Sequence, residues 1–310
     1  PEAVRARARA LAMRELRHRG PLNDVLDRFA PAGLGPVLLK GAALAYDLYP
    51  SPAWRERGDA DVLVRPGQRD AAHAILADLG YVRDTGEGMP DAHSLQQLWV
   101  LPLDDGSSHD IDLHIAPLNA PRFRDALTHE DALRGRRPLP ALGPAAAAPS
   151  RAFMLLHAAI HRRFNETVPY RVGTRWHVGG ERLIWLVDID LLARAMDPGE
   201  WADFVQLTER LEEGRSALAA LEATQRALGT PVPAEVRAAL AAAIPAAPGY
   251  FDRGKAGRAW LDLGALPARR RAGFALARLF PSRAFMRAKY PGAAPLPVLY
   301  LRRLAALARR

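Results

Sequence analysis

Apolar positions repeat with a helical period through the second half of the chain. Residues at 153–164, 181–196, 199–213, 216–228 and 234–243 carry apolar side chains three or four positions apart, which predicts five helices. Two arginine-rich helices are expected at 267–280 and 297–309. Near the N-terminus the same spacing predicts a helix over 2–18 and a separate short helix after Pro21.

Shorter apolar segments in the first half have the pattern of strands. Residues 37–39 are apolar, 59–64 alternate in polarity, and 95–101 and 109–115 form two strand candidates on either side of Gly106. A helical pattern at 68–79 ends at Gly80. This order predicts an α+β fold, with a small mixed β-sheet core and flanking helices followed by a mostly α-helical domain.

A stretch rich in proline, glycine and alanine at 135–149 predicts a domain boundary. We expect an N-terminal helical segment at 1–30, a catalytic core at 31–145, and a helical domain with a basic C-terminal segment at 146–310.

Composition excludes several classes of protein. Of the 310 residues, 49% are hydrophobic and 25% are charged, which is typical of a globular chain. The chain has no cysteine, which excludes disulfides and cysteine-ligated zinc. No apolar stretch reaches the length of about 18 residues that a transmembrane helix needs. The N-terminal residues lack the apolar core of a secretory signal, so we expect a cytoplasmic location.

The net charge of +9 leaves the partner open. Such a charge attracts phosphates, nucleic acid or anionic lipid. The basic residues are almost all arginine, a bias that also arises from a GC-rich genome. The basic C-terminal third, which includes Arg269, Arg270 and Arg271, is either a solvated face or a surface for an anionic acceptor or membrane.

Four aspartates carry the candidate chemistry. Side chains alternate along a strand, so Asp59 and Asp61 share one face and can bind one divalent cation. Asp110 and Asp112 share a face of a later strand, and either can supply a third carboxylate. Magnesium prefers such oxygen ligands. The alternative is a solvated polar strand edge.

Basic residues and glycines lie close to these aspartates in the sequence. Lys40 can place a point charge on phosphate, and Gly41 follows it in an apolar context. Arg55 and Arg57 come just before Gly58, and either guanidinium can grip a triphosphate or neutralise the aspartates.

These motifs resemble the DNA polymerase β-type nucleotidyltransferases, and more narrowly a bacterial family of uncharacterised nucleotidyltransferases. The matching elements are Leu39-Lys40-Gly41, Arg55 through Val64, and Asp112-Leu113-His114. The resemblance implies that Asp59, Asp61 and Asp112 hold Mg²⁺, or Mn²⁺ in its place, against a nucleoside triphosphate (NTP). Lys40, Gly41, Arg55, Arg57 and Gly58 would bind the nucleotide. Ala42 stands where the family places a serine, so one phosphate contact is missing.

The resemblance extends into the helical half through His157, His161, Arg182 and Asp188. His157 and His161 lie four apart on one helix face, where they either line the cleft or pack between helices. The helix lacks the glutamate of the common zinc-protease motif. His114, His157, His161 and Arg182 are therefore candidate contacts to the acceptor or the base, and Asp188 is expected to cap or pair within a buried helix.

The activity implied is transfer of a nucleoside monophosphate from an NTP to a hydroxyl of a small molecule, peptide or protein. A nucleic-acid acceptor is less favoured. The alternative function is a non-catalytic nucleotide- or nucleic-acid-binding module on the same fold.

Overall fold

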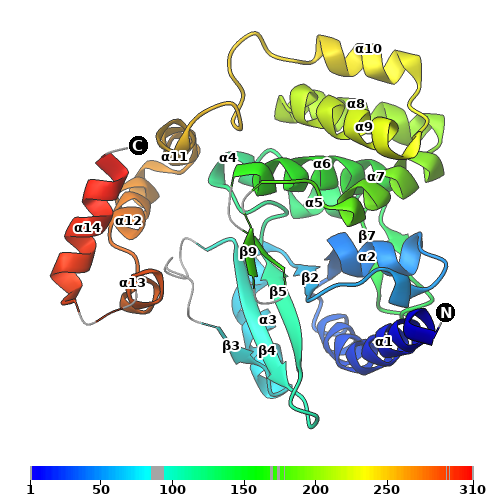
Figure 1. Cartoon of the computed structure of the whole chain (residues 1–310), viewed down its shortest axis with the longest axis horizontal. Helices are drawn as coiled ribbons and strands as arrows, with labels where there is room; N and C mark the ends of the chain where they lie inside the picture. Colours follow the sequence, from blue (N-terminus) through cyan, green and yellow to red (C-terminus); the bar gives the residue numbers. More distant parts are fainter. Residues whose placement is uncertain are drawn as a thin grey trace.

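A five-stranded mixed sheet forms the centre of the N-terminal half. The computed structural model describes residues 2–84, 94–167, 170–172, 175–177, 179–290, 292 and 294–308. The sheet has the order β1-β2-β5-β4-β3, in which β2 and β5 are parallel and the other pairs antiparallel (Figure 1). Its strands are β1 (Val37–Leu39), β2 (Ala60–Leu63), β3 (Val82–Arg83), β4 (Gln96–Pro102) and β5 (Ser108–His114).

Successive side chains along β2 and β5 point to opposite faces of the sheet, so that apolar and polar residues are separated. Ala60 and Val62 of β2 pair with Ile111 and Leu113 of β5, and all four side chains are buried. The residues between them point to the opposite face, because successive strand side chains alternate. Apolar packing on one face thus fixes which side of the sheet carries the polar residues.

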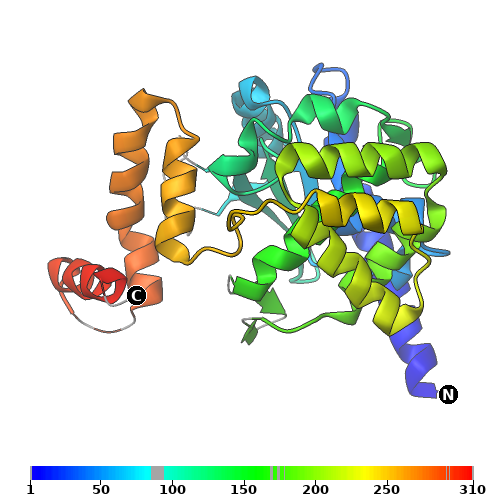
Figure 2. The same cartoon turned by 90° about the horizontal axis from the view of Figure 1, so that it is seen from above.

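Helices cover the sheet and continue to the C-terminus. They are α1 (Glu2–Phe29), α2 (Lys40–Asp47), α3 (Arg69–Asp78), α4 (Pro121–Arg124), α5 (His129–Leu133), α6 (Arg151–Thr167), α7 (Leu183–Ala195), α8 (Pro198–Leu211), α9 (Gly214–Leu228), α10 (Ala234–Ala242), α11 (Lys255–Gly264), α12 (Ala268–Leu279), α13 (Arg283–Lys289) and α14 (Leu296–Ala308). Helices α6 to α10 pack against one another, and Figures 1 and 2 place α11 to α14 to one side. The expected α+β fold with a helical second half is confirmed.

The first helix differs from the prediction. We expected a break at Pro21, but α1 runs without interruption from Glu2 to Phe29. Leu22, Val25, Leu26 and Phe29 are each at most 1% exposed and lie on one helix face. Their burial outweighs the cost of about 3 kcal/mol that an interior proline imposes.

Several elements were not predicted. They include α11, α13 and two short hairpins, β6 (Arg137–Pro138) with β7 (Ala147–Ala148) and β8 (Tyr170–Val172) with β9 (Arg175–His177). Strands of two or three residues are too short to give a periodic signal. β7 contacts β1, so part of the stretch expected as a boundary packs beside the sheet. None of the helices in the described ranges is both long and apolar enough to cross a membrane.

Candidate active site

Two carboxylates meet on neighbouring strands. In the parallel β2–β5 pair, Asp61 lies directly opposite Asp112. Ligand atoms of Asp61, Asp112 and His114 all lie within 4.8 Å of one another, and the three residues are buried. Asp110 is on the same strand face but outside this group, and its Oδ1 accepts a hydrogen bond from Ser108 Oγ at 2.7 Å. The geometry therefore favours Asp112 as the second carboxylate of the cluster.

His114 joins the two carboxylates. Its Nε2 lies 3.0 Å from Asp61 Oδ1 and 3.3 Å from Asp112 Oδ2. Burial would lower the pKa of His114, but the charge of Asp112 and hydrogen bonds to both aspartates raise the pKa to about 9. A protonated imidazole donates hydrogen bonds, so His114 orients the two carboxylates while no cation is bound between them.

Lys40 supplies the second positive charge. Its ammonium contacts Asp61 Oδ1 from the start of α2. Burial would raise the pKa of Asp61, but Lys40 and His114 together hold that pKa below its usual range. Burial would likewise lower the pKa of Lys40, but Asp61, Asp112 and Asp59 raise it above its usual value. A cation that binds Asp61 must therefore compete with Lys40 for Oδ1.

The backbone of Lys40 is itself unusual. Its φ angle is +47°, a left-handed conformation that residues other than glycine seldom adopt. The strand β1 ends at Leu39 and α2 begins at Lys40, so the chain turns within one residue. Such backbone strain persists only where surrounding contacts impose it, and it concentrates at functional sites.

The side chain of Arg55 packs against this turn at Gly41. A Cβ atom added to Gly41 would lie 3.2 Å from Arg55 Cζ, which explains the glycine. Arg55 donates two hydrogen bonds to Asp188 of α7, from Nε to Oδ1 at 2.8 Å and from Nη2 to Oδ2 at 2.7 Å. Its Nη1 donates to the Glu56 carbonyl oxygen at 2.6 Å. The guanidinium of Arg55, which the sequence suggested as a ligand of the triphosphate, thus binds Asp188 in this structure.

Tyr49 also contacts the buried pair of Arg55 and Asp188. Its hydroxyl donates to Asp188 Oδ1 at 2.7 Å. Burial and the adjacent Asp188 charge raise the pKa of Tyr49 above its usual value. Arg55 and Asp188 are 9% and 5% exposed, so this contact joins the N-terminal half to the helical half in a nearly dry environment.

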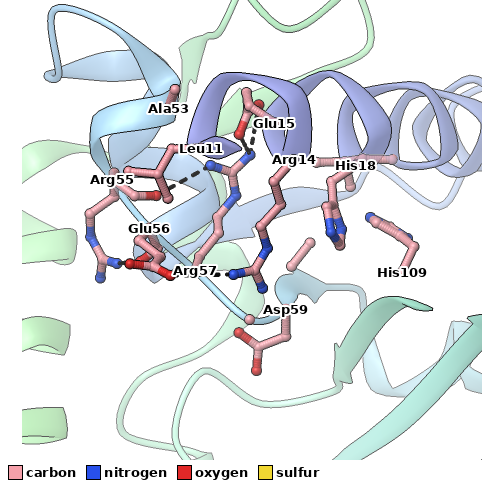
Figure 3. A pocket seen from close by; sticks show the side chains of 13 residues that line it. Leu11, Arg14, Glu15, His18, Ala53, Arg55, Glu56, Arg57, Asp59 and His109 are labelled. Atoms are coloured by element: carbon pink, nitrogen blue, oxygen red, sulfur yellow. Dashed lines mark hydrogen bonds and ion pairs between the residues drawn. The ribbon is translucent and has the colours of Figure 1, made fainter. Parts of the chain in front are cut away.

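Arg57, Gly58 and Asp59 line a pocket beside the carboxylates. The pocket lies between α1 and the loop that precedes β2, with Arg14 and His18 on the α1 side (Figure 3). Arg57 Nη2 lies 2.7 Å from Glu15 Oε2, and its guanidinium stacks 5.4 Å from the centre of the Tyr46 ring. Arg57 is therefore held by α1 and points away from the aspartates.

Asp59 lies one residue before β2 rather than within it, and its side chain is accessible to solvent. Desolvation by the surrounding protein and the negative charge of Asp61 nevertheless raise the pKa of Asp59 to about 7. Asp59 is not part of the tight group of Asp61, Asp112 and His114. It stands at the exposed edge of that group.

The histidines of α6 have different surroundings. His157 is 1% exposed and donates from Nε2 to the Pro117 carbonyl oxygen at 2.9 Å, which is a packing role. Burial and Lys40 lower the pKa of His157 to about 3. His161 is partly exposed and its ring lies edge-on to Trp185, with centroids 5.8 Å apart. Arg182, just before α7, places its guanidinium 5.3 Å from the centre of the same Trp185 ring.

A family model described as uncharacterised nucleotidyltransferase matches residues 1–229, a range that includes the Lys40-Gly41 turn and the aspartates of β2 and β5. The chain belongs to this uncharacterised nucleotidyltransferase family. A comparison with curated proteins gave no match.

Membership of the nucleotidyltransferase family assigns the chain to the transferases of phosphorus-containing groups. The match extends from α1 to the end of α9 and includes every residue that the sequence proposed for the site. Helices α10 to α14 lie beyond it.

The donor atoms of the nucleotidyltransferase site suit a divalent metal. Asp61 and Asp112 offer carboxylate oxygens at close range, and Asp59 stands nearby. Hard cations such as Mg²⁺ bind oxygen and take their remaining ligands from water and phosphate. The geometry of the described residues thus fits a cation held by a few protein oxygens.

Sequence reasoning missed the partners that hold the nucleotidyltransferase site in place. Glu15 fixes Arg57, and Asp188 fixes Arg55 across 133 sequence positions. One signal was available: Asp188 follows the apolar start of α7, and a carboxylate buried there requires a partner.

Proposed function

We propose that this chain is a magnesium-dependent nucleotidyltransferase that moves a nucleoside monophosphate from an NTP to a hydroxyl group. The observation that carries the proposal is the pairing of Asp61 with Asp112 beside Lys40 at the start of α2. The acceptor hydroxyl would belong to a small molecule, a peptide or a protein. We place the activity in the cytoplasm, where NTPs are available.

The phosphates would bind at the start of α2. The first backbone N–H groups of a helix have no partner within the helix and favour anions. Leu39, at the N-cap position, provides no side-chain cap for these groups. Ala42 is fully buried, so phosphate contacts here would come from Lys40 and the backbone rather than from a side-chain hydroxyl.

Asp59, Asp61 and Asp112 would hold Mg²⁺, or Mn²⁺ in its place. A bound cation neutralises charge on the phosphates as pyrophosphate departs. Lys40, released from Asp61, would turn its ammonium towards the triphosphate. Asp112 would accept the proton of the acceptor hydroxyl. The hydroxyl oxygen would attack the α-phosphorus, and the bond between the α-phosphorus and pyrophosphate would break. His114 would keep both carboxylates aligned throughout.

The helical half would present the acceptor or the base. His161 and Arg182 both face the Trp185 ring, and His161 lies close enough to Lys40 and Asp61 to sense their charges. His161 and Arg182 are partly exposed, whereas the Trp185 ring that they contact is 7% exposed. A guanidinium and an imidazole beside the phosphates would suit a planar ring.

Pyrophosphate release tests the proposal directly. Each of the four NTPs would be incubated with Mg²⁺ and a panel of hydroxyl acceptors, and the products would be identified by mass spectrometry. Asp61→Asn and Asp112→Asn should abolish release, whereas Asp110→Asn should retain it because Asp110 lies outside the cluster. Normal turnover in either of the first two variants would disprove the mechanism.

The alternative is a non-catalytic module that binds nucleotide or nucleic acid. It predicts nucleotide binding without pyrophosphate release in the presence of any acceptor. Equilibrium dialysis with labelled NTP, run beside the release assay, separates the two functions.

A further inference from the structure

Positive charge is concentrated in one part of the chain. Residues 255–310, named here the C-terminal segment, contain 13 arginines and lysines and a single acidic residue, which gives a net charge of +12. The whole chain carries +9, so residues 1–254 carry −3. The match to the nucleotidyltransferase family ends at residue 229, before this segment begins.

The one acid of the C-terminal segment is withdrawn from its surface. Asp262 is 1% exposed, and its carboxylate accepts hydrogen bonds from Tyr250 Oη at 3.2 Å and from the Arg122 backbone N–H at 3.4 Å. The surface of the segment therefore carries positive side chains without acidic ones between them. An anionic partner would therefore meet no negative side chain that repels it.

Large apolar side chains are also exposed on this segment. At the end of α12, Leu276 is 57% and Leu279 39% exposed, and Phe280, the residue after the helix, is 49% exposed. Their spacing places them on one side of the helix end. On α14, Val298 is 38% and Leu301 66% exposed. We call these five residues the C-terminal apolar stripe.

The two parts of the C-terminal apolar stripe are close in space. The rings of Phe280 and Tyr300 are 5.7 Å apart, and Arg303 donates to the Arg278 carbonyl oxygen at 2.6 Å. The end of α12 thus lies against α14, with arginines beside the stripe. Both views show these helices at the side of the molecule, away from the sheet (Figures 1 and 2).

We propose that the C-terminal segment is a docking surface for membranes that contain anionic phospholipids. Its arginines would pair with lipid phosphates while the C-terminal apolar stripe enters the boundary between headgroups and acyl chains. Helices with one basic and one apolar face bind at this depth without crossing the bilayer. Each arginine near an anionic leaflet adds to the affinity.

The apolar stripe distinguishes lipid from nucleic acid as the partner. Nucleic-acid phosphates would engage the arginines equally well. They would leave Leu276 and Leu301 in water, since bases stack on aromatic rings rather than on aliphatic side chains. Only a partner that is both anionic and apolar satisfies the two kinds of exposed side chain together.

Liposome sedimentation of the full chain tests the proposal, with no nucleotide present. We expect pelleting with vesicles of phosphatidylcholine and phosphatidylglycerol, none with phosphatidylcholine alone, and weaker binding at high salt. Replacing Arg269 and Arg270 by Gln should lower the affinity about tenfold or more. The matched control replaces Arg5 and Arg9 by Gln, which makes the same charge change on α1 and should leave binding unaltered.

A second pair of variants tests the apolar contribution. Leu301→Asn should weaken vesicle binding, whereas Leu16→Asn on α1, where the leucine is 62% exposed, should not. Circular dichroism would check that each variant is folded. Absence of lipid-dependent pelleting, equal losses in the α1 controls, or RNA binding that depends on Arg269 and Arg270 while vesicles are ignored would each overturn the proposal.

Discussion

Removing the carboxylate of Asp188 should destabilise the protein more than any surface ion pair could. The side chains of Arg55 and Asp188 are 10% and 7% exposed, so water screens their interaction very little. In Asp188→Ala the guanidinium of Arg55 loses two hydrogen bonds and keeps a nearly buried charge. Loss of one partner from such a pair costs about 3–5 kcal/mol in the free energy of unfolding.

Urea unfolding followed by circular dichroism measures this cost. The double variant Arg55→Met with Asp188→Leu removes both charges and should recover most of the loss, because apolar replacements of a buried pair are often neutral. Glu222→Ala is the matched control, since Glu222 and Arg226 form an exposed pair on α9 with side chains 44% and 73% exposed. It should change the free energy by about 0.5 kcal/mol or less.

Two results would refute this reasoning. A loss below about 1 kcal/mol in Asp188→Ala would mean that water reaches Arg55 and solvates it, contrary to its burial. A double variant as unstable as the single one would mean that packing at this position, rather than the unpaired charge, dominates.

Three further outcomes follow from the structure. Gly214→Ala should lower stability by about 2 kcal/mol or more, because a Cβ there would lie 2.7 Å from the Leu240 carbonyl oxygen, whereas Gly264→Ala, with no atom within 4 Å, should raise it by up to about 1 kcal/mol; equal thermal shifts would contradict this. Burial raises the pKa of Glu213 to about 7 from 4.5, so the folded state keeps a proton that the unfolded state has lost between these values, and stability should fall as pH rises across that window. The free energy of unfolding of Glu213→Gln should therefore exceed that of the wild type by up to about 3 kcal/mol at pH 8, and the two should be similar near pH 5. A difference in stability that stays constant across pH would be inconsistent with the raised pKa of Glu213. Finally, Mn²⁺ should raise the melting temperature of the wild type and EDTA should reverse the rise, while Asp61→Asn should show no rise; equal rises in both proteins would place the cation elsewhere.

Local patterns in the sequence determined much of the architecture. Alternation at 59–64 and 109–115 gave two strands and the faces of their aspartates, and helical spacing gave the helices of the second half. These patterns are local because each strand or helix repeats within a few residues. They also indicated that Asp61 and the later aspartates could share a side of the sheet.

The tertiary structure decided which polar groups face one another. Pairing of β2 with β5 in parallel register placed Asp112, not Asp110, opposite Asp61, and the fold brought Arg55 against Asp188 of α7. Burial on one face of α1 carried that helix through Pro21. Such outcomes depend on contacts between residues tens to hundreds of positions apart, where packing and desolvation outweigh local preference, so no pattern along the chain encodes them.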